Sequence, residues 1–145
     1  MTDSQGPIVR VTHRFAAPPE RVFNAWLDPA TARHFLFATP SGEMVKVDIE
    51  SRPGGRYEIV ERRNGEDIGH VGEYLEIDRP RRLVFTLQLP RYSASVDRIT
   101  IEVAPLPDGC LLTLSDQMAP GTEEYAERAR NGWTTILANL EKILG

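Results

Sequence analysis

The sequence has a single cysteine, Cys110, among its 145 residues. An internal disulfide is therefore excluded, and the cysteine pairs typical of structural zinc sites are missing. The three histidines, His13, His34 and His70, are far apart and have neither His-x3-His nor His-Glu-x2-His spacing, so no metal site is predicted. Each histidine is expected at the surface or in a hydrogen bond, and Cys110 is expected to pack inertly in a strand.

Long hydrophobic runs are also lacking. The longest, from Phe35 to Ala38, has only a few residues, whereas a membrane helix needs about 20, so we expect no membrane insertion. The opening residues, MTDSQGPIVR, contain an early acidic residue and no apolar stretch of the kind that a signal peptide carries. We therefore expect a cytoplasmic protein.

Excess positive charge is absent as well. Asp and Glu number 21 against 17 Lys and Arg, which gives a net charge of -4 and makes nucleic acid a poor candidate partner. Hydrophobic residues (41%) and charged residues (26%) are near the globular norm. A chain of this length can bury a sizeable core, so we expect one domain over residues 1–145.

Period-two alternation dominates most of the chain. It predicts strands, separated by Gly, Pro and Asn-Gly turns, over residues 8–15, 43–51, 55–63, 68–78, 82–89, 95–106 and 110–118. Between the first two, Pro18-Pro19 begins a helix that Asp28-Pro29 ends, and a second short helix reaches His34. The short connections between the later strands indicate an antiparallel meander.

The last segment, residues 122–144, changes to helical periodicity, with apolar residues such as Trp133, Leu137 and Leu140 on one stripe. One long helix covering one face of a seven-stranded antiparallel sheet is an α+β fold. Gly132 lies in the interior of this helix, where it costs about 1 kcal/mol relative to Ala. We expect a close approach to a neighbouring element to explain it.

The stretch RPGGRYEIV contains the pair Gly54-Gly55. A phosphate-binding loop would continue with Lys-Ser or Lys-Thr and a helix, but here a strand follows. We interpret the pair as a tight corner between two strands, and no cofactor is predicted.

Four motifs occur in order along the chain: APPERVFNAWLDPATARHF, RPGGRYEI, GEYLEIDRPRRLVFT and NGWTTILANLEKIL. Together they resemble the activator of heat-shock protein 90 ATPase homologue family of the START-like (SRPBCC) superfamily, over residues 8 to 144. The resemblance implies a helix-grip fold like that of the birch pollen allergen, with a curved sheet round the last helix and an apolar cavity between them. Members often carry Trp-Phe where this chain has His34-Phe35, so the mouth of the cavity is expected to differ.

If the more apolar side of the sheet faces the helix, one set of residues lines the interior. The candidate ligand-binding residues are Trp26, Phe35, Phe37, Tyr57, Ile59, Glu61, Phe85, Leu87, Asp97, Ile99, Leu114, Asp116, Trp133, Leu137 and Leu140. Trp26 and Phe35 are expected near the opening. The same pattern is also what plain core packing would produce.

Two considerations bear on that choice. An empty cavity of about 300 Å³ would cost on the order of 7 kcal/mol, so aromatic side chains, water or a ligand must fill the space. Glu61, Asp97 and Asp116 alternate with inward residues, and a buried carboxylate is costly unless paired. These three either mark a functional site or lie at strand ends in water.

Three functions remain open. The first is binding of an apolar or amphipathic small molecule by a monomer or weak homodimer. The second is a cavity enzyme of the cyclase, hydrolase or dehydratase type that uses Asp116, Glu61 or Tyr57 as acid or base. The third, which the family name alone suggests, is stimulation of a chaperone ATPase. We favour the first and assign no catalytic residue.

Overall fold

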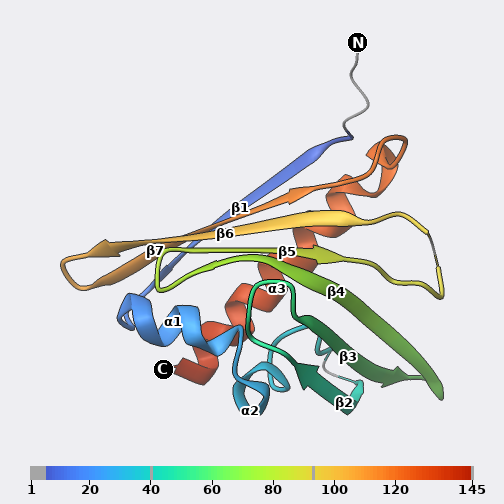
Figure 1. Ribbon diagram of the computed structural model, residues 1–145, viewed down its shortest axis with the longest axis horizontal. Helices are drawn as coiled ribbons and strands as arrows, with labels where there is room; N and C mark the ends of the chain where they lie inside the picture. The colour runs from blue at the N-terminus through green and yellow to red at the C-terminus, as the bar shows by residue number, and fades with distance from the viewer. Residues whose placement is uncertain (1–5, 40, 93, 145) are drawn as a thin grey trace.

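The computed structural model describes residues 6–39, 41–92 and 94–144. Its elements, in chain order, are β1 (Ile8–Phe15), α1 (Pro19–Ala25), α2 (Pro29–Ala32), β2 (Glu43–Ile49), β3 (Arg56–Arg63), β4 (Glu66–Asp78), β5 (Arg82–Leu87), β6 (Asp97–Leu106), β7 (Gly109–Gln117), a 3-10 turn (Glu123–Tyr125) and α3 (Ala126–Leu144) (Figure 1). The predicted α+β fold with its seven strands is confirmed. The element ends differ from those predicted by a few residues, most at the start of α3, where a 3-10 turn precedes the helix, and at the end of α1.

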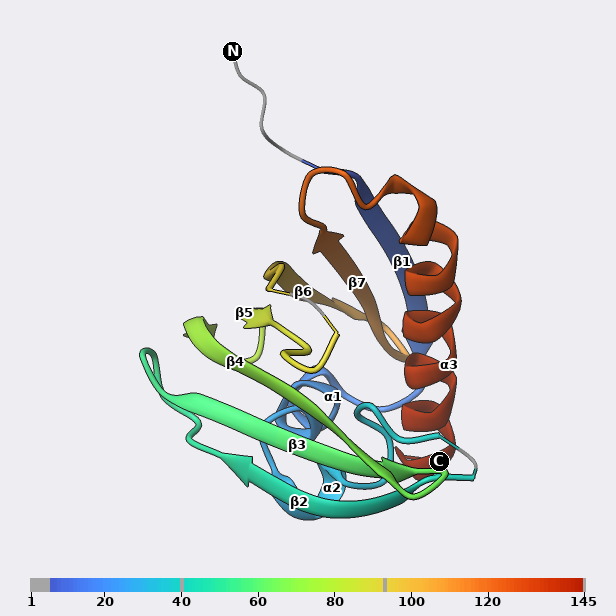
Figure 2. The same ribbon diagram turned by 90° about the vertical axis from the view of Figure 1, so that its right-hand side faces the viewer.

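All seven strands form one antiparallel sheet in the order β1-β7-β6-β5-β4-β3-β2. From β2 to β7, each strand pairs with the strand that follows it in the chain. Strand β1 pairs with β7 and forms one edge of the sheet. Figure 2 shows the sheet curving away from α3, from β1 beside the helix round to β2 and β3. The sheet and the helix thus enclose the core between them.

The two short helices lie at one end of this enclosure, near the C-terminal end of α3 (Figure 1). Pro18 precedes α1, and Asp28 caps α2 by accepting a hydrogen bond from the backbone N–H of Ala30 at 3.4 Å. Such caps satisfy the free donors of a helix start. Their buried residues, Val22, Phe23 and Ala32, join the core.

The glycine pair forms a strand corner, as predicted. Gly54 has a φ of 83°, a conformation that favours glycine, and a side chain on Gly55 would collide with the carbonyl oxygen of Glu50. The backbone of both glycines also pairs with Tyr74 of β4. These hydrogen bonds hold the β2–β3 connection against β4. Strand β3 begins directly after the glycine pair.

The expectation for Gly132 is wrong. The residue is exposed on α3, and no heavy atom lies within 4 Å of the position that a Cβ would take. The buried face of α3 consists of Trp133, Ile136, Leu137 and Leu140. Gly132 directly precedes Trp133 in the sequence but lies outside this face. No neighbouring element requires glycine at this position.

Within the described part of the chain, no helix is long and apolar enough to cross a membrane.

Candidate binding site between the sheet and the last helix

The sequence-predicted residues converge on the space between the sheet and α3. One buried cluster holds Trp26, Phe35, Phe37, Tyr57, Ile59, Phe85, Ile99, Leu114, Trp133, Leu137 and Leu140. Leu87 is half-buried against it at the end of β5. Trp26 and Phe35 pack edge to face, with ring centroids 5.2 Å apart, and neither reaches the surface, in contrast to their expected place near the opening.

A polar group interrupts this apolar interior where β6 begins and β7 ends. Asp116 is 1% exposed, and its Oδ2 accepts a hydrogen bond of 2.9 Å from the indole N–H of Trp133. Asp97, half-buried on the neighbouring strand, hydrogen-bonds to the Asp116 carboxyl and accepts from the backbone N–H of Ala119. Two carboxyl groups can share such a bond only if one of them holds a proton.

The environment identifies the protonated partner. Burial raises the pKa of Asp97 to about 8, and the hydrogen bond and charge of Asp116 contribute in the same direction. Burial also raises the pKa of Asp116, while the hydrogen bonds from Asp97 and Trp133 oppose that rise. Asp97 therefore keeps its proton near neutral pH and donates it to an ionised Asp116.

Glu61 is the third inward carboxylate, and it is bound differently. It forms an ion pair with Arg63 and accepts hydrogen bonds from the backbone N–H of Thr39, at 2.5 Å, and from the Thr39 hydroxyl, at 2.9 Å. Arg63 also reaches the carbonyl of Phe37. The hydrogen bonds between Glu61 and Thr39 thus hold the segment after α2 against β3. Since Glu61 and Asp116 are both 1% exposed, neither is a strand-end carboxylate in water.

The side chain of Phe37 connects these two groups. Its ring stacks on His70, with centroids 4.3 Å apart, and meets Trp133 edge to face at 5.9 Å. His70 is 4% exposed, and its Nδ1 lies 3.2 Å from the carbonyl oxygen of Ile59. The sequence analysis did not place His70 in the site; its period-two spacing from the buried Ile68 of β4 was the available signal.

Tyr57, a sequence candidate for acid or base chemistry, is held by the backbone. Its hydroxyl donates a 2.6 Å hydrogen bond to the carbonyl oxygen of Thr86, and burial raises its pKa well above the usual value. The indole N–H of Trp26, by contrast, is buried without a hydrogen-bond partner in the described structure.

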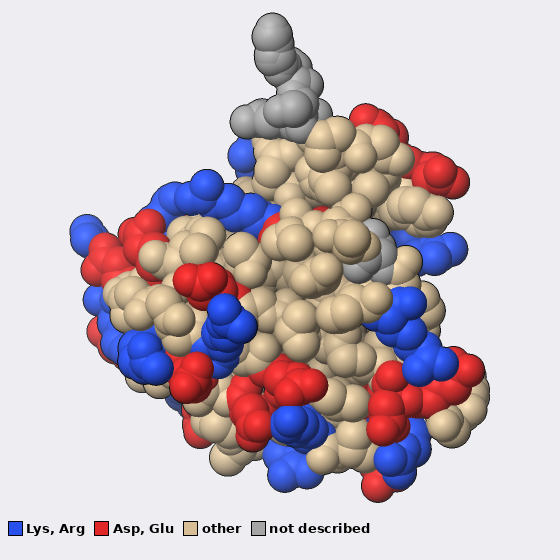
Figure 3. Space-filling model, turned by 45° about the vertical axis from the view of Figure 1, so that its right-hand side comes forward, with Lys and Arg blue, Asp and Glu red and all other residues tan. Residues whose placement is uncertain are grey.

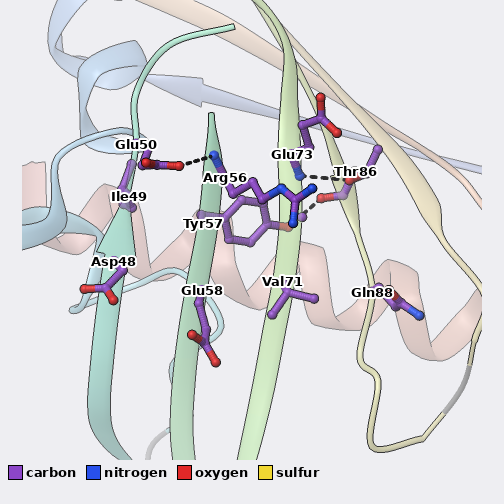
Figure 4. A pocket seen from close by; sticks show the side chains of 11 residues that line it. Asp48, Ile49, Glu50, Arg56, Tyr57, Glu58, Val71, Glu73, Thr86 and Gln88 are labelled. Carbon is purple, nitrogen blue, oxygen red and sulfur yellow. Dashed lines mark hydrogen bonds between the residues drawn. The ribbon is translucent and has the colours of Figure 1, made fainter. Parts of the chain in front are cut away.

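A hollow lies on the outer face of the sheet, which faces away from α3 (Figure 4). It is an open groove of about 810 Å³ across β2, β3, β4 and β5. Figure 4 shows Asp48, Glu58 and Val71 along its strands, with α3 behind the sheet. Lys46 forms ion pairs with Asp48 and Glu58, so this groove is charged, and Tyr57 is the one aromatic residue among its lining residues.

The face nearest the Asp97–Asp116 pair is poor in charge. The β5–β6 and β7–α3 connections lie on the right of Figure 1, and Figure 3, with that side forward, shows an uncharged band between charged flanks. The β5–β6 connection exposes Tyr92 and Val96. This band is the nearest surface to the polar end of the interior.

Metal chemistry finds no support in the described residues, where no three His, Cys, Asp or Glu side chains group to hold an ion. Cys110 is buried, its Sγ lies 3.5 Å from the carbonyl oxygen of Ala17, and burial raises its pKa. A raised pKa disfavours the reactive thiolate, which agrees with an inert packing role.

A curved antiparallel sheet round a long helix, with polar groups buried between them, defines a helix-grip domain of the START-like (SRPBCC) superfamily. The family model for "Activator of Hsp90 ATPase homolog 1-like protein" matches residues 16–145, and the chain belongs to that family. Among curated proteins no sequence matches.

Solved structures agree with this assignment. A protein from Chromobacterium violaceum is 26% identical, with a TM-score of 0.84 over 94% of this chain and 95% of its own. An AHSA1-like protein from Aeromonas hydrophila is 17% identical, with a TM-score of 0.80 over 94% and 90% of the two chains. A protein of unknown function from Staphylococcus aureus is 16% identical, with a TM-score of 0.83 over 94% and 92%. The last two show the fold alone.

Proposed function

We propose that this protein binds an apolar or amphipathic small molecule between the sheet and α3, as a cytoplasmic monomer or weak homodimer without a cofactor. The observation that carries the proposal is the buried Asp97–Asp116 pair, bonded to Trp133, at one end of an aromatic interior. A largely apolar space with a few convergent polar groups is the usual composition of small-molecule sites. Membership of a superfamily whose fold typically encloses a ligand cavity agrees with it.

The side chains that fill this interior must shift to admit a ligand. Phe37 is the candidate to move, because it is a non-glycine residue with a φ of 59° and its ring covers both His70 and Trp133. We expect ligand binding to displace this ring and to change the fluorescence of Trp133.

The first test is native mass spectrometry of freshly purified protein, followed by titration with the neutral fluorophore N-phenyl-1-naphthylamine. We expect saturable binding of one molecule per chain. Replacing Leu137, which faces the interior, by Phe should weaken the affinity about tenfold, because the larger ring occupies ligand space. Thermal melting of Leu137→Phe verifies that the variant is folded.

Ile143→Phe is the matched control, since Ile143 lies on the same helix but is exposed. It should bind the fluorophore as the wild type does. Absence of saturable binding, or equal affinity of the Leu137 and Ile143 variants, would reject an interior site.

An enzyme in the same space is the second candidate, and one observation favours it. A protonated Asp97 beside an ionised Asp116 provides an acid and a base together. Glu61 and Tyr57 are less suited to such a role, because Arg63 and the Thr86 carbonyl already engage them. A pH–rate profile unaffected by Asp116→Asn would remove this pair from any such mechanism. Chaperone regulation rests on the family name alone and is the least favoured.

A further inference from the structure

The inward carboxylates differ in their charge balance. Glu61 has a cation, Arg63, within its hydrogen-bond network. Among the residues that the structure describes, no Lys, Arg or His forms an ion pair with Asp97 or Asp116, whose donors are the indole of Trp133 and the N–H of Ala119. The second oxygen of Asp116, Oδ1, is buried and has no hydrogen-bond partner among the described residues other than the carboxyl of Asp97.

One shared proton leaves the pair with a single negative charge. A buried charge without a counter-ion is costly, and donors that are neutral offset only part of that cost. A ligand that brings a positive charge to this position would remove the imbalance. The adjoining rings of Trp133 and Phe37, whose centroids lie 5.9 Å apart, provide aromatic surface of the kind that favours cations.

We infer that the ligand is a cationic amphipath, with a protonated amine bound by the carboxyl groups of Asp97 and Asp116 and an apolar body among the interior aromatic side chains. This inference rests on the proposed function and specifies its ligand class. A carboxylate ligand would place another negative charge beside the pair, and a neutral alcohol would leave the existing charge unbalanced.

The geometry also determines what happens to the shared proton. An arriving ammonium group lowers the pKa of Asp97, so in a fraction of the molecules Asp97 gives up its proton to solvent as the amine binds, and in the rest the single charge of the pair balances the ammonium. Binding of an amine near pH 7 is therefore accompanied by release of up to one proton, whereas binding of an alcohol with the same body releases none.

Isothermal titration calorimetry with three probes of one apolar body tests this: phenylbutylamine, phenylbutanol and phenylbutyrate. We expect the amine to bind at least about tenfold more tightly than the alcohol, and the carboxylate most weakly. Repeating the titrations in buffers of different ionisation enthalpy measures the proton release.

Asp97→Asn should abolish the proton release and keep an amine preference, because Asp116 alone still carries one negative charge. The double variant Asp97→Asn/Asp116→Asn removes that charge and should abolish both the amine preference and the proton release. A substitution at the half-buried Asp97 should cost less stability than one at the buried Asp116. Thermal melting verifies that both variants are folded. Asp48→Asn, in the outer groove, changes the net charge by the same one unit as the double variant and should keep both effects.

The possible results separate this inference from the proposed function. If the alcohol binds as tightly as the amine, or the preference survives in the double variant, the cationic class is wrong and interior binding stands. If Asp48→Asn abolishes the preference, the amine binds the outer groove and the inference fails. If N-phenyl-1-naphthylamine and all three probes fail to bind saturably, the proposed function fails together with it.

Discussion

The imidazole of His70 is a basic group in a largely apolar place. It lies between the carbonyl oxygen of Ile59 and the ring of Phe37, with Arg63 and Glu61 as its nearest charges. Burial lowers its pKa from 6.5 to about 4, and the charge of Arg63 adds to that effect. His70 therefore stays neutral in the folded protein, where it supports the Phe37 ring.

This predicts a loss of stability in mild acid. As the pH falls through 6.5, His70 becomes protonated in the unfolded chain. In the folded protein His70 is not protonated until the pH reaches about 4, so protonation favours the unfolded state. Between about pH 7.5 and pH 5, the free energy of unfolding of the wild type should fall by about 2 kcal/mol more than that of His70→Asn. Urea denaturation at the two pH values measures the difference.

His34→Asn provides the control, because His34 is exposed. It should show the same pH dependence as the wild type. A wild type and a His70→Asn variant with parallel curves would show that His70 is not buried as a neutral group.

At the scale of elements, helix α3 has one face packed against the sheet and one face exposed to solvent. Trp133, Leu137 and Leu140 are buried against the sheet, while Gly132 is in the open. Glycine in an exposed helix interior carries a backbone entropy cost that no contact offsets here.

Gly132→Ala should therefore raise the free energy of unfolding by about 1 kcal/mol and the melting temperature by about 3 °C. Gly72→Ala is the contrasting variant, because a Cβ there would collide with the carbonyl oxygen of Thr86, and it should destabilise the protein. Both effects are measured by thermal unfolding. A Gly132→Ala variant less stable than the wild type would mean that the helix needs glycine for a reason other than space.

At the scale of the whole molecule, the sheet has two edges, β1 and β2. Strand β2 presents Glu43, Lys46 and Asp48, and charged side chains on an edge oppose pairing with another chain. Strand β1 lies against α3, and the carbonyl oxygen of Arg10 in β1 accepts a hydrogen bond from the Arg130 side chain.

We accordingly expect a monomer of 16.3 kDa at micromolar concentration. Size-exclusion chromatography with light scattering measures the mass. A dimer that persists on dilution would show that an edge or the outer face of the sheet forms an interface.

Local rules made much of the fold predictable. Period-two alternation and the turn glycines identified seven strands, and the switch to helical spacing identified α3, because these patterns depend on neighbours in the chain. The same alternation placed Ile59, Leu114 and Asp116 on the inward face.

The state of each polar group depended on the tertiary structure. Glu61, Asp97 and Asp116 all alternate with inward apolar residues in their strands. In the folded protein, however, Glu61 forms an ion pair with a cation, while Asp97 and Asp116 share a proton. The cation of Glu61 is Arg63, two residues along the same strand, whereas Thr39, Trp133 and Ala119 come from segments that no local pattern connects. The sequence by itself determined which side chains face inward, because strand geometry is local. Only the tertiary structure decided that Asp97 and Asp116 share a proton without a cation, because these two carboxyls and the indole of Trp133 meet through the packing of separate elements.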